Sequence, residues 1–128
     1  MIDFRRVTKT YGRNVNALNN VSLSIGKGEF VFLVGPSGAG KSTFVRLLLR
    51  EELPTEGQIV VDGIDTGRLR PAQMPFFRRR IGMVFQDFRL LPERTVTENV
   101  AFALRVVETP RREIYRRVPQ VLYLVGLA

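Results

Sequence analysis

The sequence contains no cysteine and no histidine. Without cysteine the chain can have no disulfide framework, no thiolate metal site and no cysteine nucleophile, which suits a reducing compartment. It also has no apolar run near the ~20 residues that a membrane-spanning helix needs, and residues 1–6 lack the apolar stretch of a signal peptide. We therefore expect any membrane contact to come through a partner.

Acidic residues are the scarcer charged class, with 12 against 20 basic residues and a net charge of +8. Such a balance is compatible with nucleic acid, anionic lipid or a polyphosphate ligand as partner. The arginine clusters are dispersed along the chain, which favours solvated faces over a dedicated nucleic-acid stripe. A basic nucleic-acid-binding protein nevertheless remains an alternative of a different class.

Two kinds of strand pattern occur in the chain. The pattern predicts strands at residues 2–7, 17–25 and 29–34, and residues 21–25 alternate like a half-exposed antiparallel strand. By contrast, residues 29–34 and 81–85 are almost continuously apolar, which is typical of strands buried in a parallel sheet. We therefore expect an antiparallel part and a parallel core.

Helical patterns separate and follow these strands. Residues 41–50 place Phe44, Leu47 and Leu48 on one side, and a short strand at 58–61, a turn at 62–63 and a short helix near 71–77 come next. Thr95 and Glu98 form a capping-box pattern, which predicts a helix after them. Thr109 and Pro110 predict the start of another helix, which Pro119 should bend.

Residues 35–42 read Gly-Pro-Ser-Gly-Ala-Gly-Lys-Ser, the phosphate-loop pattern. We expect the three glycines to adopt positive φ, so that backbone amides point inward at an anion, and the following helix to add its positive dipole end. Lys41 should reach the β and γ phosphates, Ser42 should bind Mg²⁺, and Thr43 should contact the α phosphate. The alternative is a glycine-rich turn that only joins a strand to a helix. The expected phosphate-binding residues are Gly35, Pro36, Ser37, Gly38, Ala39, Gly40, Lys41, Ser42 and Thr43.

Together with this loop, Tyr11 and the run Ile-Gly-Met-Val-Phe-Gln at residues 81–86 resemble the ABC ATPase family. The resemblance covers essentially the whole chain, and residues 54–57 and 61–63 resemble the connecting hairpin of the family. It implies an α/β fold, the P-loop NTPase fold of ABC type, with an antiparallel β subdomain, an incomplete parallel core sheet and helices. It also implies ATP and Mg²⁺ as ligands.

The resemblance assigns roles to two residues outside the loop. Tyr11 would stack on adenine, although it could instead be an aromatic residue that fills the end of a strand. Gln86 would bind Mg²⁺ and the attacking water, although it could instead be a polar cap on a strand. Lys41 and Gln86 are thus the expected catalytic residues, and Ser42 and Gln86 the expected metal ligands.

Residues 86–96 resemble the bacterial cell-division ATPases of this family. This implies an FtsX-like integral membrane protein as partner, docking near Phe88, Leu90 and Leu91, unless these side chains pack under the next helix. It further implies a head-to-tail homodimer of full-length chains, peripheral association with the cytoplasmic face of the bacterial inner membrane, and no specific nucleic acid. A related exporter or lipoprotein-release ATPase is the alternative within the family.

Three elements that the family needs for hydrolysis do not occur in this sequence. These are a strand ending in Asp-Glu, a Ser-Gly-Gly signature helix and a switch histidine. We therefore expect residues 1–128 to be the amino-terminal part of a single nucleotide-binding domain, which binds ATP but does not turn it over.

Overall fold

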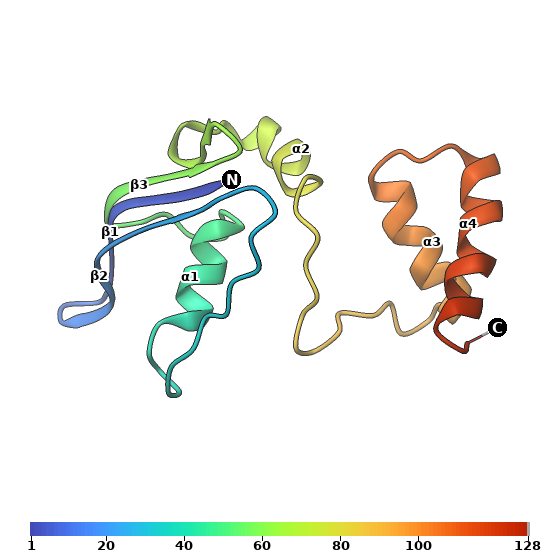
Figure 1. The fold of residues 1–128 in the computed structure, drawn as a ribbon, viewed down its shortest axis with the longest axis horizontal. Coiled ribbons are helices and arrows are strands. Elements are labelled where there is room, and N and C mark those ends of the chain that lie inside the picture. The colour runs from blue at the N-terminus through green and yellow to red at the C-terminus, as the bar shows by residue number, and fades with distance from the viewer. Residues whose placement is uncertain (128) are drawn as a thin grey trace. The chain divides into compact units, whose positions relative to one another are not determined.

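The computed structural model describes residues 1–127. The described chain forms two compact units, Met1–Arg78 and Arg79–Ala128. Their elements follow the chain from blue to red in Figure 1. Each unit is described by itself below.

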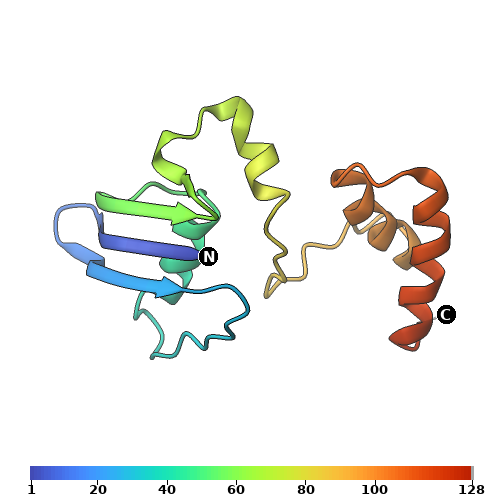
Figure 2. The same ribbon diagram turned by 45° about the horizontal axis from the view of Figure 1, so that its top comes forward.

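An antiparallel sheet forms most of the first unit. Its strands are β1 (Ile2–Tyr11), β2 (Val15–Ile25), β3 (Glu56–Val61) and the short β4 (Ile64–Asp65), in the order β2-β1-β3-β4. Figure 2 shows β1 between β2 and β3. Burial alternates from Val21 to Ile25, which confirms the half-exposed strand expected there.

The three long strands share an irregularity. Pairing of β1 shifts between Phe4 and Val7 on one side and between Arg5 and Thr8 on the other. Arg6, Asn20 and Gly57 have φ of 49°, 48° and 88°. Such bulges locally bend and twist a sheet. A side chain at position 57 would bring its Cβ to 2.3 Å from the Arg6 carbonyl oxygen, so only glycine fits this close approach.

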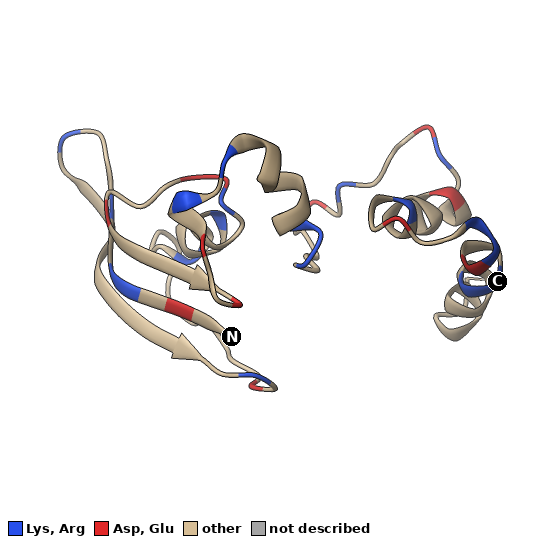
Figure 3. Ribbon diagram, turned by 90° about the horizontal axis from the view of Figure 1, so that it is seen from above, with Lys and Arg blue, Asp and Glu red and all other residues tan. Residues whose placement is uncertain are grey.

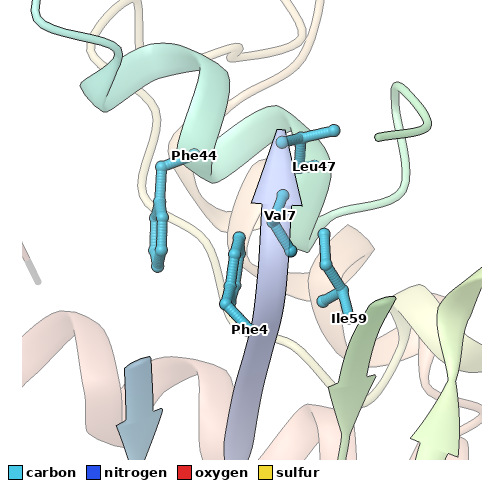
Figure 4. Close-up of a cluster of buried hydrophobic side chains, with 5 residues drawn as sticks. All are labelled: Phe4, Val7, Phe44, Leu47 and Ile59. Atoms are coloured by element: carbon cyan, nitrogen blue, oxygen red, sulfur yellow. The ribbon is translucent and has the colours of Figure 1, made fainter. Parts of the chain in front are cut away.

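The core of the first unit lies between this sheet and helix α1 (Lys41–Leu48). Phe44 and Leu47 of α1 are buried against Phe4, Val7 and Ile59 (Figure 4). The Phe4 and Phe44 rings are stacked, with centroids 4.3 Å apart. Because burial of each such side chain contributes about 1.5–3 kcal/mol, these contacts fix the helix that follows the glycine loop.

Short helical segments complete the first unit. They are η1 (Thr66–Arg68), η2 (Pro71–Gln73) and α2 (Met74–Arg78), which confirms the short helix expected near residues 71–77. Arg78 donates to the carbonyls of Leu49 and Arg50, both at 3.1 Å. These bonds satisfy carbonyl groups that the end of α1 would otherwise leave without partners.

The second unit is a helical hairpin of α3 (Val96–Val106) and α4 (Arg111–Leu124). The predicted capping box is confirmed: the Thr95 hydroxyl accepts from the Glu98 amide, and the Glu98 carboxylate accepts from the Thr95 amide. The two helices bury a small apolar cluster, and α4 continues through Pro119. The buried members of this cluster are Ala101, Ile114, Val118 and Leu122.

The two strands expected in a parallel core are wrong for this structure. Residues 29–34 and 81–85 form no strand, and their side chains include Phe30, Val34 and Val84 with exposed fractions of 84%, 87% and 88%. A buried strand needs hydrogen-bonding neighbours on both sides. Among residues 1–127 neither segment has them, because the only sheet is the antiparallel one. The apolar pattern indicated burial without identifying what would cover it.

Candidate functional site

The glycine loop folds into a compact turn directly before α1. The Ala39 amide donates to the Pro36 carbonyl at 3.2 Å, and Gly38 and Gly40 have φ of 81° and 94°. These two glycines therefore adopt the left-handed conformation that was expected. The same expectation is wrong for Gly35, which is not in that conformation. At Gly35 space is limited instead, since a Cβ there would lie 3.1 Å from the Ala39 Cβ, a tight contact.

Gly40 anchors the end of the loop against the sheet. A Cβ at this position would lie 2.3 Å from the Ala17 carbonyl oxygen of β2 and 3.1 Å from a Leu18 methyl carbon. This approach and the positive φ both require glycine. The sheet therefore fixes where the loop ends and where α1 begins.

The amino-terminal end of α1 is open to an anion. Gly40 is the N-cap and supplies no side-chain hydrogen bond, and the first turn contains no acidic residue. The first helical hydrogen bond joins the Phe44 amide to the Gly40 carbonyl at 2.8 Å, so the preceding helix amides have no acceptor within the helix. Those N–H groups and the helix dipole favour a phosphate group.

Side chains at the loop match this electrostatic arrangement. Lys41 Nζ donates to the carbonyls of Gly35 and Pro36, the latter at 2.6 Å, so its ammonium lies across the loop. Residues 35–39 are exposed, as is Ser42. Thr43 is buried. The arrangement brings one ammonium, one exposed hydroxyl and a set of free amides to the same end of α1.

Tyr11 lies at the end of β1, and its hydroxyl reaches α1 and the segment after it. The hydroxyl donates to Glu52 Oε2 and lies 3.4 Å from Thr43 Oγ1. Lys9 Nζ lies 5.1 Å from the centre of the Tyr11 ring, a cation–π distance. The half-buried ring is thus held next to the helix of the phosphate loop.

Glu52 connects these groups. Its carboxylate lies 3.4 Å from Lys9 Nζ and 3.5 Å from a guanidinium nitrogen of Arg46. The pKa of Glu52 is lowered, chiefly by the hydrogen bond from Tyr11. Burial opposes this effect in part, and the hydrogen bond and charge of Lys9 and the charge of Arg46 lower the pKa further. Sequence reasoning missed Glu52, because an acid between a helix and Pro54 has no motif and is typical of a solvated turn.

Gln86 and the expected docking residues belong to the second unit. Gln86 is exposed and begins the turn at residues 86–89. Phe88, Leu90 and Leu91 have exposed fractions of 73%, 66% and 37%, and the Phe88 amide donates to the Phe85 carbonyl at 3.1 Å. The Arg89 guanidinium lies 3.8 Å from the centre of the Phe85 ring. The roles of these residues in metal binding and docking remain predictions.

The side chains at the phosphate loop can bind Mg²⁺ only together with the phosphates of a bound nucleotide. Among residues 1–127 there is no cluster of three or more His, Cys, Asp or Glu that could hold a metal ion. Mg²⁺ in nucleotide sites uses one or two protein ligands, with phosphates and water completing the octahedron. The exposed Ser42 hydroxyl at the start of α1 fits that requirement.

The charge distribution shows no single basic stripe in the described chain. Figure 3 shows Lys and Arg dispersed over the elements of both units, with acidic residues among them. Several arginines are paired, as in Arg79–Glu108 at 2.7 Å and Arg117–Glu113 at 2.5 Å. Within residues 1–127 no helix has the length and hydropathy needed to cross a bilayer.

This chain is similar to ATP-binding proteins of cell division and of methionine import. It is 53% identical to the cell division ATP-binding protein FtsE of Bacillus subtilis, over 99% of this chain and 56% of that protein. Identity is 51% to FtsE of Mycobacterium tuberculosis, over 100% of this chain and 56% of the relative. Identity is 44% to the methionine import ATP-binding protein MetN 3 of Oceanobacillus iheyensis, over 100% of this chain and 38% of that protein. The chain thus spans about half the length of its FtsE relatives.

A solved structure gives the same result for the fold. The ATP-binding cassette MJ0796, in a dimeric post-hydrolysis state bound to ADP and Pi, superposes with a TM-score of 0.85 at 38% identity. The match covers 100% of this chain and 58% of that chain. It confirms the α/β fold of ABC type, although residues 29–34 and 81–85 do not form the parallel strands. The model of the ABC transporter family matches residues 18–128, and the chain belongs to this family.

Proposed function

We propose that this chain binds Mg-ATP as the nucleotide-binding part of an ABC-type ATPase that acts in bacterial cell division. The observation that carries the proposal is the loop itself. Two left-handed glycines and the unblocked start of α1 present amides to an anion, and Lys41 lies across them. The similarity to FtsE supports the cell-division role.

The loop residues bind the phosphates in this proposal. Lys41 exchanges its two carbonyl acceptors for β- and γ-phosphate oxygens, since a charge-assisted bond to phosphate is stronger than one to a neutral carbonyl. The loop amides hold the remaining phosphate oxygens, Thr43 contacts the α phosphate, and Tyr11 stacks on adenine. Ser42 and Gln86 would hold Mg²⁺, which supplies neutralisation of the charge on the phosphates.

Calorimetric titration with Mg-ATP tests this proposal. We expect saturable binding by the wild type and at least about tenfold weaker binding by Lys41→Ala, since a desolvated ammonium–phosphate contact is lost. Lys27→Ala is the matched control, because it removes the same charge from an exposed turn. Equal affinity of Lys41→Ala and the wild type would remove the loop from the account.

Turnover requires groups that this sequence does not supply. Phosphoryl transfer depends on positioning the attacking water and the metal, and residues 1–128 contain no histidine and no Asp-Glu pair. We therefore propose that residues 1–128 form the amino-terminal part of a single nucleotide-binding domain and bind ATP with negligible hydrolysis. Phosphate release that depends on Lys41 would contradict this.

We also propose peripheral membrane association through an FtsX-like integral membrane protein that docks near Phe88, Leu90 and Leu91. The exposure of these three side chains supports the docking surface. Head-to-tail dimerisation of full-length chains is proposed with it, supported by the dimeric cassette structures. The site would then lie at the cytoplasmic face of the inner membrane.

Another ABC role is the second candidate, because MetN relatives also match the whole chain. The membrane protein that co-purifies with the tagged protein from its host distinguishes the two. Recovery of a cell-division membrane protein supports the first role, whereas recovery of a transport permease or exporter supports the second. If the Leu90→Asp variant no longer co-purifies with this membrane protein, the result would support binding of the partner at the proposed docking surface.

A further inference from the structure

We propose that Glu52 is a positioning residue for the base-binding tyrosine and links it to the helix of the phosphate loop. This inference rests on the proposed function and extends it, since it adds a residue that touches no ligand. Glu52 lies outside the loop and accepts the hydrogen bond from the Tyr11 hydroxyl. Its effect on nucleotide binding would therefore pass through the orientation of the Tyr11 ring.

Glu52 contacts both β1, which carries Tyr11, and α1, the helix of the phosphate loop. One oxygen, Oε2, accepts from Tyr11 and lies 3.4 Å from Lys9 Nζ, and both of these residues belong to β1. The other oxygen lies 3.5 Å from Arg46 of α1. The side chain is thus fixed by a strand on one side and by the phosphate-loop helix on the other.

Two further contacts define the position of the tyrosine. Its hydroxyl lies 3.4 Å from Thr43 Oγ1, which is buried in α1 two residues after Lys41. Lys9 Nζ, besides facing Glu52 and lying over the Tyr11 ring, donates to the Leu53 carbonyl at 2.8 Å. The ring therefore has a hydrogen bond at its tip and a fixed cation near its face.

This arrangement matters because stacking depends on where the ring lies. A base stacked on an aromatic ring gains attraction only over the part of its face that overlaps the ring. Freeing the Tyr11 hydroxyl would let the ring leave the position set by α1, which holds the phosphates. The base and the phosphates would then no longer be bound at a fixed separation. As a result, the part of the ATP affinity that comes from stacking of the base would decrease.

The experiment compares ATP with inorganic tripolyphosphate, both with Mg²⁺, by calorimetry on the full chain. In Glu52→Ala we expect about three- to tenfold weaker ATP binding, a fraction of the full effect of a stacked base. Glu52→Gln should lose less, because its amide oxygen can still accept from the Tyr11 hydroxyl. Tripolyphosphate affinity should stay within about twofold of the wild type. Glu56→Gln is the matched control, an exposed carboxylate of the same unit.

A second pair of variants separates positioning from general stability. Tyr11→Phe keeps the ring but removes the hydroxyl, so it should weaken ATP binding as Glu52→Ala does. The double variant of these two substitutions should be no weaker than either alone, because both remove the same contact. Additive losses, or a parallel fall in tripolyphosphate affinity, would show a merely structural role for Glu52 and overturn the inference.

The outcomes also separate this inference from the proposed function. If Lys41→Ala binds both ligands like the wild type, the phosphate loop is not the site, whatever Glu52 does. If Lys41→Ala loses both ligands but Glu52→Ala binds ATP like the wild type, the proposed function stands and the Glu52 inference fails. Equal affinity of the wild type for ATP and tripolyphosphate also overturns it, since no base contribution then exists.

Discussion

At the scale of single residues, two glycines determine how the backbone of the first unit can approach itself. Gly40 lies against the Ala17 carbonyl and Gly57 against the Arg6 carbonyl, each with space for hydrogen but not for a methyl group. Gly40 connects the phosphate loop to β2, and Gly57 lies where β3 meets the bulge of β1. Substitution of either glycine should therefore lower the stability of the first unit even without a ligand.

Gly57→Ala should lower the free energy of unfolding by about 2 kcal/mol or more, because it combines a backbone clash with an unfavourable φ. Gly63→Ala is the matched control. Gly63 also has positive φ, 78°, but nothing lies within 4 Å of its Cβ position, so only the conformational cost of about 1 kcal/mol applies. Urea unfolding of both variants checks this, and equal losses would contradict the close approach at Gly57.

Glu52 should make the first unit sensitive to acid. Its folded-state pKa is lowered, chiefly by the Tyr11 hydrogen bond, so its stabilising effect is complete above the ordinary glutamate pKa of about 4.5. That effect is lost as the pH falls below this value through the folded pKa. Glu52→Gln should therefore lose less stability than the wild type between about pH 6 and pH 3. Thermal unfolding followed at each pH, with Glu56→Gln as control, measures this. A pH dependence of Glu52→Gln equal to that of the wild type would contradict it.

At the scale of elements, sequence reasoning succeeded where the deciding interactions are local. The helix after the loop, the turn at 62–63 and the Thr95–Glu98 cap each depend on residues a few positions apart, and all were confirmed. The antiparallel alternation at 21–25 was also confirmed. The apolar runs at 29–34 and 81–85 failed as strands, because strand formation depends on partners that no local pattern contains.

The same distinction applies to the candidate site. The loop motif correctly predicted the left-handed glycines at 38 and 40 but not the conformation of Gly35. The Glu52 cluster joins residues 9, 11, 46 and 52, whose meeting depends on how α1 packs on the sheet. Residue type and spacing could not have shown it.

Thr95→Ala should destabilise the α3–α4 hairpin by about 1 kcal/mol, since it removes a confirmed N-cap. Thr97→Ala, in the first turn of the same helix, is the control and should change stability by less than about 0.5 kcal/mol. Circular dichroism during urea unfolding compares the two. Similar losses in both variants would indicate that the cap contributes nothing beyond helix propensity.

At the scale of the whole molecule, the described chain combines a well-packed phosphate-loop unit with large exposed apolar surface. Phe30 and Phe32 contact each other edge-on, with centroids 5.0 Å apart, while remaining 84% and 77% exposed. The chain spans 56% of its Bacillus subtilis FtsE relative. In the proposed function, nucleotide binding depends mainly on the loop, its helix and the tyrosine beside it, whereas coupling to a partner is a property proposed for the full-length protein.

Nucleotide binding at the phosphate loop is measured most directly by the change in backbone amide resonances when Mg-ATP is added to isotope-labelled protein. We expect the largest shifts at residues 38–43, which the proposed function places next to the phosphates, and none of comparable size in Lys41→Ala. Loop amides that remain unchanged at saturating Mg-ATP, with shifts confined to the second unit, would contradict it.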